Sequence, residues 1–142
     1  MTALGFLVFG ITKHRPGPAN VVFGLATRLP PQAGGMAVYP FAMLSLEVLR
    51  RERNNPGLDR WIRESWLEEW YHAAHQQRPT GPFFYLAYAL EWLLDSAKGR
   101  QPYLDSSLEA DAKRWVQQVM HGLTPNPIPD FEDLVRWAKE SA

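Results

Sequence analysis

Four residues whose side chains can bind metal ions or transfer protons recur at helical spacing between residues 58 and 77. Glu64, Glu68, His72 and His75 are separated by four, four and three positions. On an α-helix these spacings place neighbouring side chains on one face, about one turn apart. Carboxylates and imidazoles arranged in this way can ligate a divalent metal, exchange protons with a substrate, or present an acidic surface to a basic partner.

A metal site is one interpretation of this face, with His72 as a ligand beside Glu68 or His75. The stretch from Glu69 to His72 also matches one half of the paired Glu-x-x-His motif of di-iron helical bundles. The second Glu-x-x-His is missing from the sequence, and Glu68 and His75 are about 10 Å apart along a helix axis. We therefore predict no metal and no cofactor, and expect a solvated face with ordinary i,i+4 ion pairs.

A second candidate stripe, Tyr88, Glu91 and Asp95, forms the polar side of a helix predicted between residues 80 and 98. Two carboxylates one turn apart beside a tyrosine could divide acid and base roles if burial separated their pKa values. Carboxyl groups on one helix do not flank a substrate as a glycosidase site requires. We therefore favour a half-exposed groove in which Lys98 neutralises an acid.

Three arginines, Arg50, Arg51 and Arg53, close another predicted helix and form a candidate anion-binding site. Guanidinium groups bind oxyanions bidentately. Cations also favour a helix C-terminus because of the helix dipole. The dipole alone accounts for the position of these arginines, and we favour that explanation.

Residues 1–37 are predicted to form a strand and loop segment. Two short apolar runs, Leu4–Ile11 and Val21–Thr27, are rich in Phe and Val and flank the Pro- and Gly-containing stretch His14–Asn20. These features predict two strands joined by a loop, followed by a linker at Leu29–Gly35. A two-stranded hairpin is marginally stable alone, so we expect it to pack on the helices that follow.

From residue 38 onward the apolar spacing is helical. The first predicted helix is Phe41–Arg53, with Leu44, Leu46, Val48 and Leu49 facing inward. The others are Leu58–Gln77, Thr80–Lys98, Ser107–His121 with Ser106 and Glu109 as a capping box, and a last helix that Asp130 caps. We therefore predict a mainly α fold of about five helices in a single domain, residues 1–142. The small N-terminal β element packs on the helical body of residues 38–142.

Composition limits the class of protein. Among 142 residues there is no cysteine, which excludes disulfides and thiolate metal sites. The net charge is zero, so general nucleic-acid binding, which requires a basic excess, is not expected. Met1–Ile11 is too short to span a bilayer and lacks the basic start of a signal peptide. We therefore expect a soluble, cytoplasmic protein without a membrane partner.

Charge is unevenly distributed along the chain. Residues 1–63 carry eight Lys and Arg against three Asp and Glu, a net charge of +5. Residues 64–142 carry seven against twelve, a net charge of −5. The asymmetry could guide one charged partner to one face. We favour the alternative that the two parts attract each other within the fold.

The leading functional hypothesis is a non-catalytic protein-binding domain, because no nucleophile elbow, Walker loop or dinucleotide motif occurs. An acidic, aromatic-bearing helix face would dock a basic protein partner. Its residues are Trp61, Glu64, Glu68, Tyr71, His72 and His75. Size and composition are those of small bacterial inhibitor or immunity proteins that occlude a cognate toxin.

Two alternatives belong to other functional classes. One is a metal-dependent or acid/base enzyme that uses Glu68, His72 and His75. The other is a homo-oligomeric adaptor with Trp61 and Tyr71 in a symmetric interface.

Overall fold

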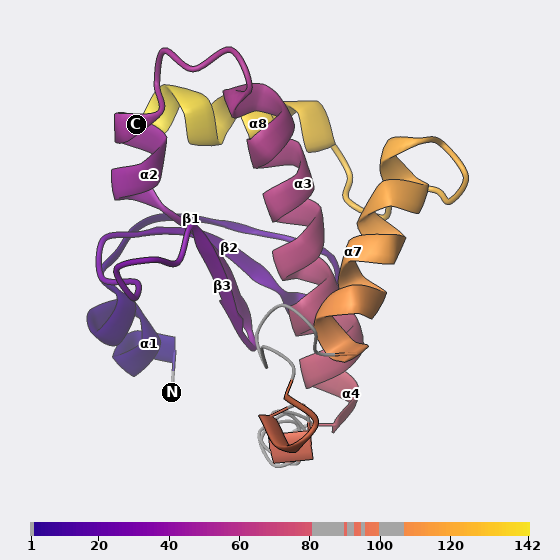
Figure 1. The fold of residues 1–142 in the computed structure, drawn as a ribbon. Coiled ribbons are helices and arrows are strands. Elements are labelled where there is room, and N and C mark those ends of the chain that lie inside the picture. The colour runs from indigo at the N-terminus through magenta and orange to yellow at the C-terminus, as the bar shows by residue number, and fades with distance from the viewer. Residues whose placement is uncertain (1, 81–89, 91–92, 95, 100–106) are drawn as a thin grey trace.

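The computed structural model describes residues 2–80, 90, 93–94, 96–99 and 107–142 (Figure 1). Within them, a mixed four-stranded sheet has a short N-terminal helix on one face and the longer helices on the other. The elements are α1 (Thr2–Phe9), β1 (Ile11–Pro16), the 3₁₀ turn η1 (Pro18–Asn20), β2 (Val22–Ala26), β3 (Gly35–Val38), β4 (Phe41–Ser45), α2 (Leu46–Arg51), α3 (Leu58–Tyr71), the π-helix η2 (His72–Gln77), α4 (Arg78–Thr80), α7 (Ser107–Met120) and α8 (Phe131–Ser141).

The strand order is β1-β2-β4-β3. β1 and β2 form an antiparallel pair, and β3 and β4 form a second one. The two pairs join through a parallel contact between β2 and β4, in which Phe23 lies opposite Ala42. β4 is therefore an interior strand, with neighbours on both sides.

β4 is also covered on both faces, and all five of its residues are buried. Successive side chains of a strand point to opposite faces. Ala42 and Leu44 belong to the main core beneath α3, whereas Phe41 and Met43 belong to a smaller core beneath α1. The run Phe41–Leu44 is accordingly apolar at every position, as expected of a strand that is covered on both faces.

The predicted mainly α fold with a small N-terminal hairpin is wrong, because the sheet is central and extends to residue 45. The predicted strand Leu4–Ile11 is mostly α1, and the predicted loop His14–Asn20 includes the end of β1. The predicted helix Phe41–Arg53 is β4 followed by α2. The physical reason is that a short, continuous apolar run has the same pattern in a buried strand and a buried helix.

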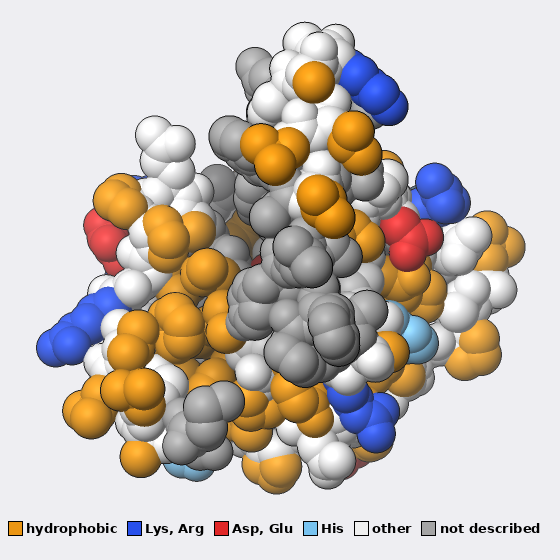
Figure 2. Space-filling model, turned by 90° about the horizontal axis from the view of Figure 1, so that it is seen from below, with side chains coloured by type: hydrophobic (Ala, Val, Ile, Leu, Met, Phe, Trp, Pro, Cys, Tyr) orange, Lys and Arg blue, Asp and Glu red, His pale blue; other side chains and the backbone are white. Residues whose placement is uncertain are grey.

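α1 is apolar on both of its sides, which is why its sequence carries no helical periodicity. A Cβ atom at Gly5 would lie 2.2 Å from a ring carbon of Phe41, so the glycine permits this close approach to β4. On the outer side, Leu4, Leu7 and Val8 are 62%, 70% and 52% exposed. Figure 2 shows apolar side chains gathered on this side of the molecule.

Three of the predicted helices are confirmed. Leu58–Gln77 corresponds to α3 and η2, Ser107–His121 corresponds to α7, and the last helix is α8. Asp130 occupies the N-cap position of α8, as predicted, but it has φ of 51° and its side chain makes no capping hydrogen bond. Most of the predicted helix Thr80–Lys98 lies outside the described residues, as does Ser106 of the capping box.

α3 packs on the sheet through Trp66, which has no exposed surface. Its ring meets Phe23 of β2 edge to face at 5.1 Å between centroids, and stacks on Trp137 of α8 at 6.4 Å. Aromatic pairs of this kind add to the free energy of burial. α3 is thereby held between the sheet and α8, with α7 along its side (Figure 1).

Ion pairs connect the two oppositely charged parts of the chain. Arg15 binds Asp133 at 2.7 Å, and Arg63 pairs with Glu132. These contacts support the expectation that the parts attract each other within the fold. Among the described residues, no helix has the length and apolar run that crossing a membrane requires.

Met43→Ala tests the burial of β4 on both faces. We expect the free energy of unfolding to fall by about 2–5 kcal/mol, because Met43 has no exposed surface. In the helix predicted from the sequence, Met43 is not among the inward-facing residues. The matched control is Leu123→Ala, since Leu123 is 78% exposed and should change stability by less than about 0.5 kcal/mol. Equal, small effects in urea denaturation would contradict this arrangement.

Candidate functional site

Three side chains that can ligate a metal converge where the C-terminal part of α3 meets the first turns of α7 (Figure 1). The Nε2 atom of His72 lies 3.4 Å from Oε1 of Glu109 and 3.9 Å from Oε1 of Glu68. One ligand atom from each residue lies within 4.8 Å of the others. Glu68, His72 and Glu109 are called the His72 cluster below.

The π-helix η2 begins at His72 and runs to Gln77, in direct continuation of α3. A π-helical stretch widens the turn and is frequent at functional sites. Here it directs two successive glutamines to different neighbours: Gln76 donates to the carbonyl of Leu108 at 2.8 Å, and Gln77 donates to the carbonyl of Ala37 at 2.7 Å. The helix is thus tied to both α7 and β3 at the cluster.

Gln76 determines which ring nitrogen of His72 faces the carboxylates. The Oε1 atom of Gln76 contacts Nδ1 of His72, while its amide nitrogen is used by Leu108. An amide oxygen only accepts hydrogen bonds, so Nδ1 must carry a hydrogen. Nε2 is therefore the nitrogen available to a proton or a metal ion, and it is the one that faces Glu68 and Glu109.

Burial and the two carboxylates act in opposite directions on His72. Burial lowers the pKa of the imidazole, but Glu109 and Glu68 outweigh this effect and raise the pKa to about 11. For Glu68, burial raises the pKa, and the neighbouring His72 and Lys113 outweigh it and lower the pKa below its ordinary value. Without a metal, the cluster therefore contains a protonated imidazole between carboxylates.

Glu69, beside the cluster, is only 9% exposed. Burial is the main reason that its pKa is raised to about 8. In the described part of the chain, no side chain or backbone N–H donates a hydrogen bond to this carboxyl group. Glu69 is consequently protonated at neutral pH, and the cationic His72 and Lys113 balance Glu68 and Glu109.

The structure brings together some members of the predicted acidic face and separates others. Glu68 and His72 share the cluster, whereas Glu64 is paired with Arg60 at 2.6 Å. His75 is exposed and stacks on Tyr71 at 4.9 Å, away from the cluster. Trp61 is half-buried.

The other two candidate sites are the polar stripe of the predicted helix Thr80–Lys98 and the three arginines near the end of α2. Tyr88, Glu91 and Asp95 lie outside the described residues. Arg51 pairs with Glu52 at 3.5 Å, and Arg53 donates to the carbonyl oxygen of Ala142 at 2.6 Å. Arg50, Arg51 and Arg53 are all exposed, and two of the three already have acceptors within the chain.

Sequence reasoning missed Glu109, Gln76 and Lys113. Glu109 was assigned only to a capping box, although it is buried and faces His72. Lys113, which binds Glu68 at 3.3 Å, follows Glu109 by one helical turn. That i,i+4 spacing places the two on one face of α7. This spacing is the one feature of the local sequence that links Glu109 to Lys113.

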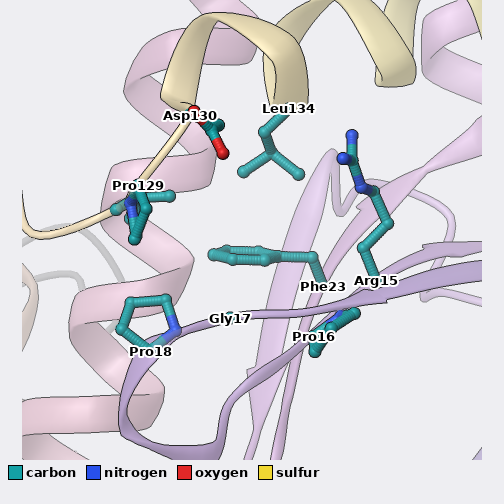
Figure 3. A pocket seen from close by; sticks show the side chains of 9 residues that line it. Arg15, Pro16, Gly17, Pro18, Phe23, Pro129, Asp130 and Leu134 are labelled. Carbon is teal, nitrogen blue, oxygen red and sulfur yellow. The ribbon is translucent and has the colours of Figure 1, made fainter.

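A pocket of about 380 Å³, whose lining includes no residue of the His72 cluster, lies between the β1–β2 connection and the start of α8. Figure 3 shows the Phe23 ring inside it, with Asp130 and Arg15 at different edges. Arg15 is already bound to Asp133 and lies over the Trp137 ring. The other lining residues are mostly apolar or proline, so this pocket lacks the convergent ionisable groups that a reaction requires.

The pKa shifts predict alkaline destabilisation of the metal-free protein. For Glu69 and His72 the folded state holds the proton more tightly than the unfolded chain. Their contribution to stability is present at low pH, and declines between about pH 4.5 and 8 for Glu69 and about pH 6.5 and 11 for His72. The free energy of unfolding, measured with chelator present, should therefore fall from pH 6 to pH 9.

Glu69→Gln should reduce the loss of unfolding free energy below about pH 8, because the amide does not ionise. At pH 9 this variant should be more stable than the unmodified protein by a few kcal/mol. Glu64→Gln is the matched control, because Glu64 lies on the same helix but is paired with Arg60 near the surface. The assignment would be wrong if Glu69→Gln kept the full pH slope.

Comparison of the chain with protein-family models, curated proteins and solved structures finds no match. The function is therefore inferred from the geometry and chemistry of the His72 cluster.

Proposed function

We propose that the protein binds a divalent transition-metal ion at the His72 cluster and uses it in metal-assisted hydrolysis. The observation that supports this is the convergence of one imidazole nitrogen and two carboxylate oxygens, from two helices, within 4.8 Å. One alternative from the sequence was a metal-dependent enzyme that uses Glu68, His72 and His75. The present proposal keeps Glu68 and His72 and replaces His75 with Glu109.

The distances within the cluster suit a metal with little movement. Tetrahedral coordination at about 2.1 Å separates neighbouring ligand atoms by about 3.4 Å. His72 and Glu109 already have this separation, and the carboxylate of Glu68 is 3.9 Å from the imidazole. Small rotations of the glutamate side chains would complete the set. One nitrogen and two oxygens are ligands that suit zinc, manganese and iron.

The neighbouring residues are those that support a metal-binding histidine. Such a histidine usually donates its second ring N–H to an oxygen, which fixes the ring orientation and tautomer. Gln76 accepts that hydrogen from Nδ1 of His72, and the carbonyl of Leu108 fixes the orientation of Gln76. The imidazole is therefore positioned before a metal arrives.

Three protein ligands leave at least one coordination position for water or substrate, as in catalytic rather than structural zinc sites. A metal in such a site lowers the pKa of bound water and polarises a carbonyl or phosphoryl oxygen. Glu69, which is buried beside the cluster, is a group that could exchange a proton with a reacting molecule.

Docking of a basic protein partner through the acidic face stays a prediction of the sequence, and so does homo-oligomerisation through Trp61 and Tyr71. The geometry adds little to the docking model. Glu64 is neutralised by Arg60, Glu68 binds Lys113, and His72 is buried. The negative charge of this face is thus largely compensated within the chain.

Metal titration tests the proposal. The chelator-treated protein should bind about one equivalent of Zn²⁺ or Mn²⁺, and its thermal stability should rise with the logarithm of the free metal concentration once that exceeds the dissociation constant. Glu109→Gln should weaken the affinity by about 100-fold or more, because it removes a ligand. His75→Gln is the matched control, since His75 is the neighbouring histidine outside the cluster, and should leave the affinity unchanged.

Binding of less than about a tenth of an equivalent, the level expected of adventitious metal, would refute the proposal. An equal loss of affinity in Glu109→Gln and His75→Gln would refute this choice of ligands. Circular dichroism of each variant establishes that helicity is retained.

A further inference from the structure

Large apolar side chains are exposed on one face of the molecule, over α1 and over the helical residues that begin at position 90. Six of the seven exposed large apolar side chains in the described part of the chain belong to these two segments, and each is more than half exposed. Figure 2 shows apolar side chains of both segments on this face. The six residues, called the apolar face below, are Leu4, Leu7, Val8, Leu90, Leu93 and Leu94.

Packing of the core does not account for the apolar face. The inner side of α1 already covers the smaller core, where Phe6 and Phe9 lie against Phe41 and Met43. The three exposed residues of α1 are outside that contact. Clustered apolar side chains on the surface of a protein commonly mark the site at which a partner or a membrane binds. The apolar face therefore has the character of a docking surface.

The charged residues beside the apolar face are positive. Arg28 is exposed and donates to the carbonyl oxygen of Leu7, in the last turn of α1, at 3.1 Å. Lys98 is exposed one helical turn after Leu94, whose carbonyl oxygen accepts its backbone N–H. No Asp or Glu occurs between residues 2 and 46. An anionic partner therefore complements the rim of this face.

Two acids occur in the sequence near the second segment. Glu91 and Asp95 lie outside the described residues. Their spacing from Lys98 assigns them to the polar stripe of the predicted helix, and not to the side that carries the leucines. A helix with an apolar side and a charged side is typical of segments that lie in a membrane surface.

A second copy of the chain complements this face less well than a membrane does. In a symmetric dimer the same surface meets itself, so Arg28 and Lys98 would approach their own copies, and like charges in contact are unfavourable. A bilayer with anionic lipids offers both an apolar layer and negative head groups. Arg and Lys can extend along the apolar layer and keep their charged ends at the head groups.

We propose that the apolar face docks on the surface of a membrane that contains anionic lipids, with its aliphatic side chains below the head groups and Arg28 and Lys98 at the phosphates. The expectation of no membrane partner rests on the length of Met1–Ile11, which is too short to span a bilayer. Docking on the surface requires no such length. No residue of the His72 cluster belongs to the apolar face, so this inference is independent of the proposed metal site.

Co-sedimentation with lipid vesicles tests the inference. The protein should bind vesicles of phosphatidylserine and phosphatidylcholine more tightly than vesicles of phosphatidylcholine alone, and added salt should weaken the binding. Chelator is present throughout, so that a metal ion cannot bridge the protein and the lipid phosphates. Leu4→Gln combined with Leu7→Gln should lower the partition coefficient by about tenfold or more, because two aliphatic side chains no longer enter the lipid.

Leu123→Gln is the matched control for the leucines and should leave the partition coefficient unchanged. Leu123 is equally exposed but lies between α7 and α8, away from α1 (Figure 1). Lys98→Gln should lower binding to the phosphatidylserine vesicles by about fivefold. Lys139→Gln, its control, replaces a lysine that pairs with Asp59 and should have no such effect. Circular dichroism establishes that each variant keeps its helicity.

Three outcomes would overturn the inference. The first is that the protein does not bind the phosphatidylserine vesicles, or binds them no better than phosphatidylcholine alone. The second is that the variant with Leu4→Gln and Leu7→Gln binds as tightly as the unmodified protein. The third is self-association without vesicle binding, measured by sedimentation velocity and abolished by the same two substitutions, which would show that a second copy covers the face.

Discussion

The burial of Trp66 between the sheet and α8 determines where α3 lies, and the rest of the structure depends on this contact. Phe23 and Trp137 enclose the indole ring, which has no exposed surface. With one side of α3 committed to the sheet, Glu68 and His72 are left on the side where α7 packs. A core contact, itself without chemistry, therefore positions the ionisable groups.

Those ionisable groups compensate one another's charge. A buried charge is costly unless it is paired and hydrogen-bonded. Protonated His72 and Lys113 compensate Glu68 and Glu109, while Glu69 avoids the cost by keeping its proton at neutral pH. A hydrophobic set of similar volume would often be at least as stable. The presence of so many ionisable side chains at one helix contact is therefore better explained by a function than by stability.

Elements with one apolar stripe could be predicted from the sequence, and elements that are apolar on several sides could not. α7 and α8 each have an exposed face, so their polar residues reveal a helical period. β4 lies between two cores, and α1 packs on Phe41 with apolar residues also on its outer side. Neither has a polar face to mark its period, and α1 was predicted as a strand while β4 was predicted as a helix.

Some features of the candidate site could likewise be predicted from the sequence, and others could not. The sequence by itself determined that Glu68 and His72 share a helix face, because a four-residue spacing is a local property of the α-helix. It also determined the absence of thiolate ligands, since the chain has no cysteine. Only the tertiary structure decided that Glu109 completes the cluster and that His75 does not belong to it. Glu109 is 37 positions beyond His72, and their contact depends on how α7 packs against α3, which no local spacing encodes.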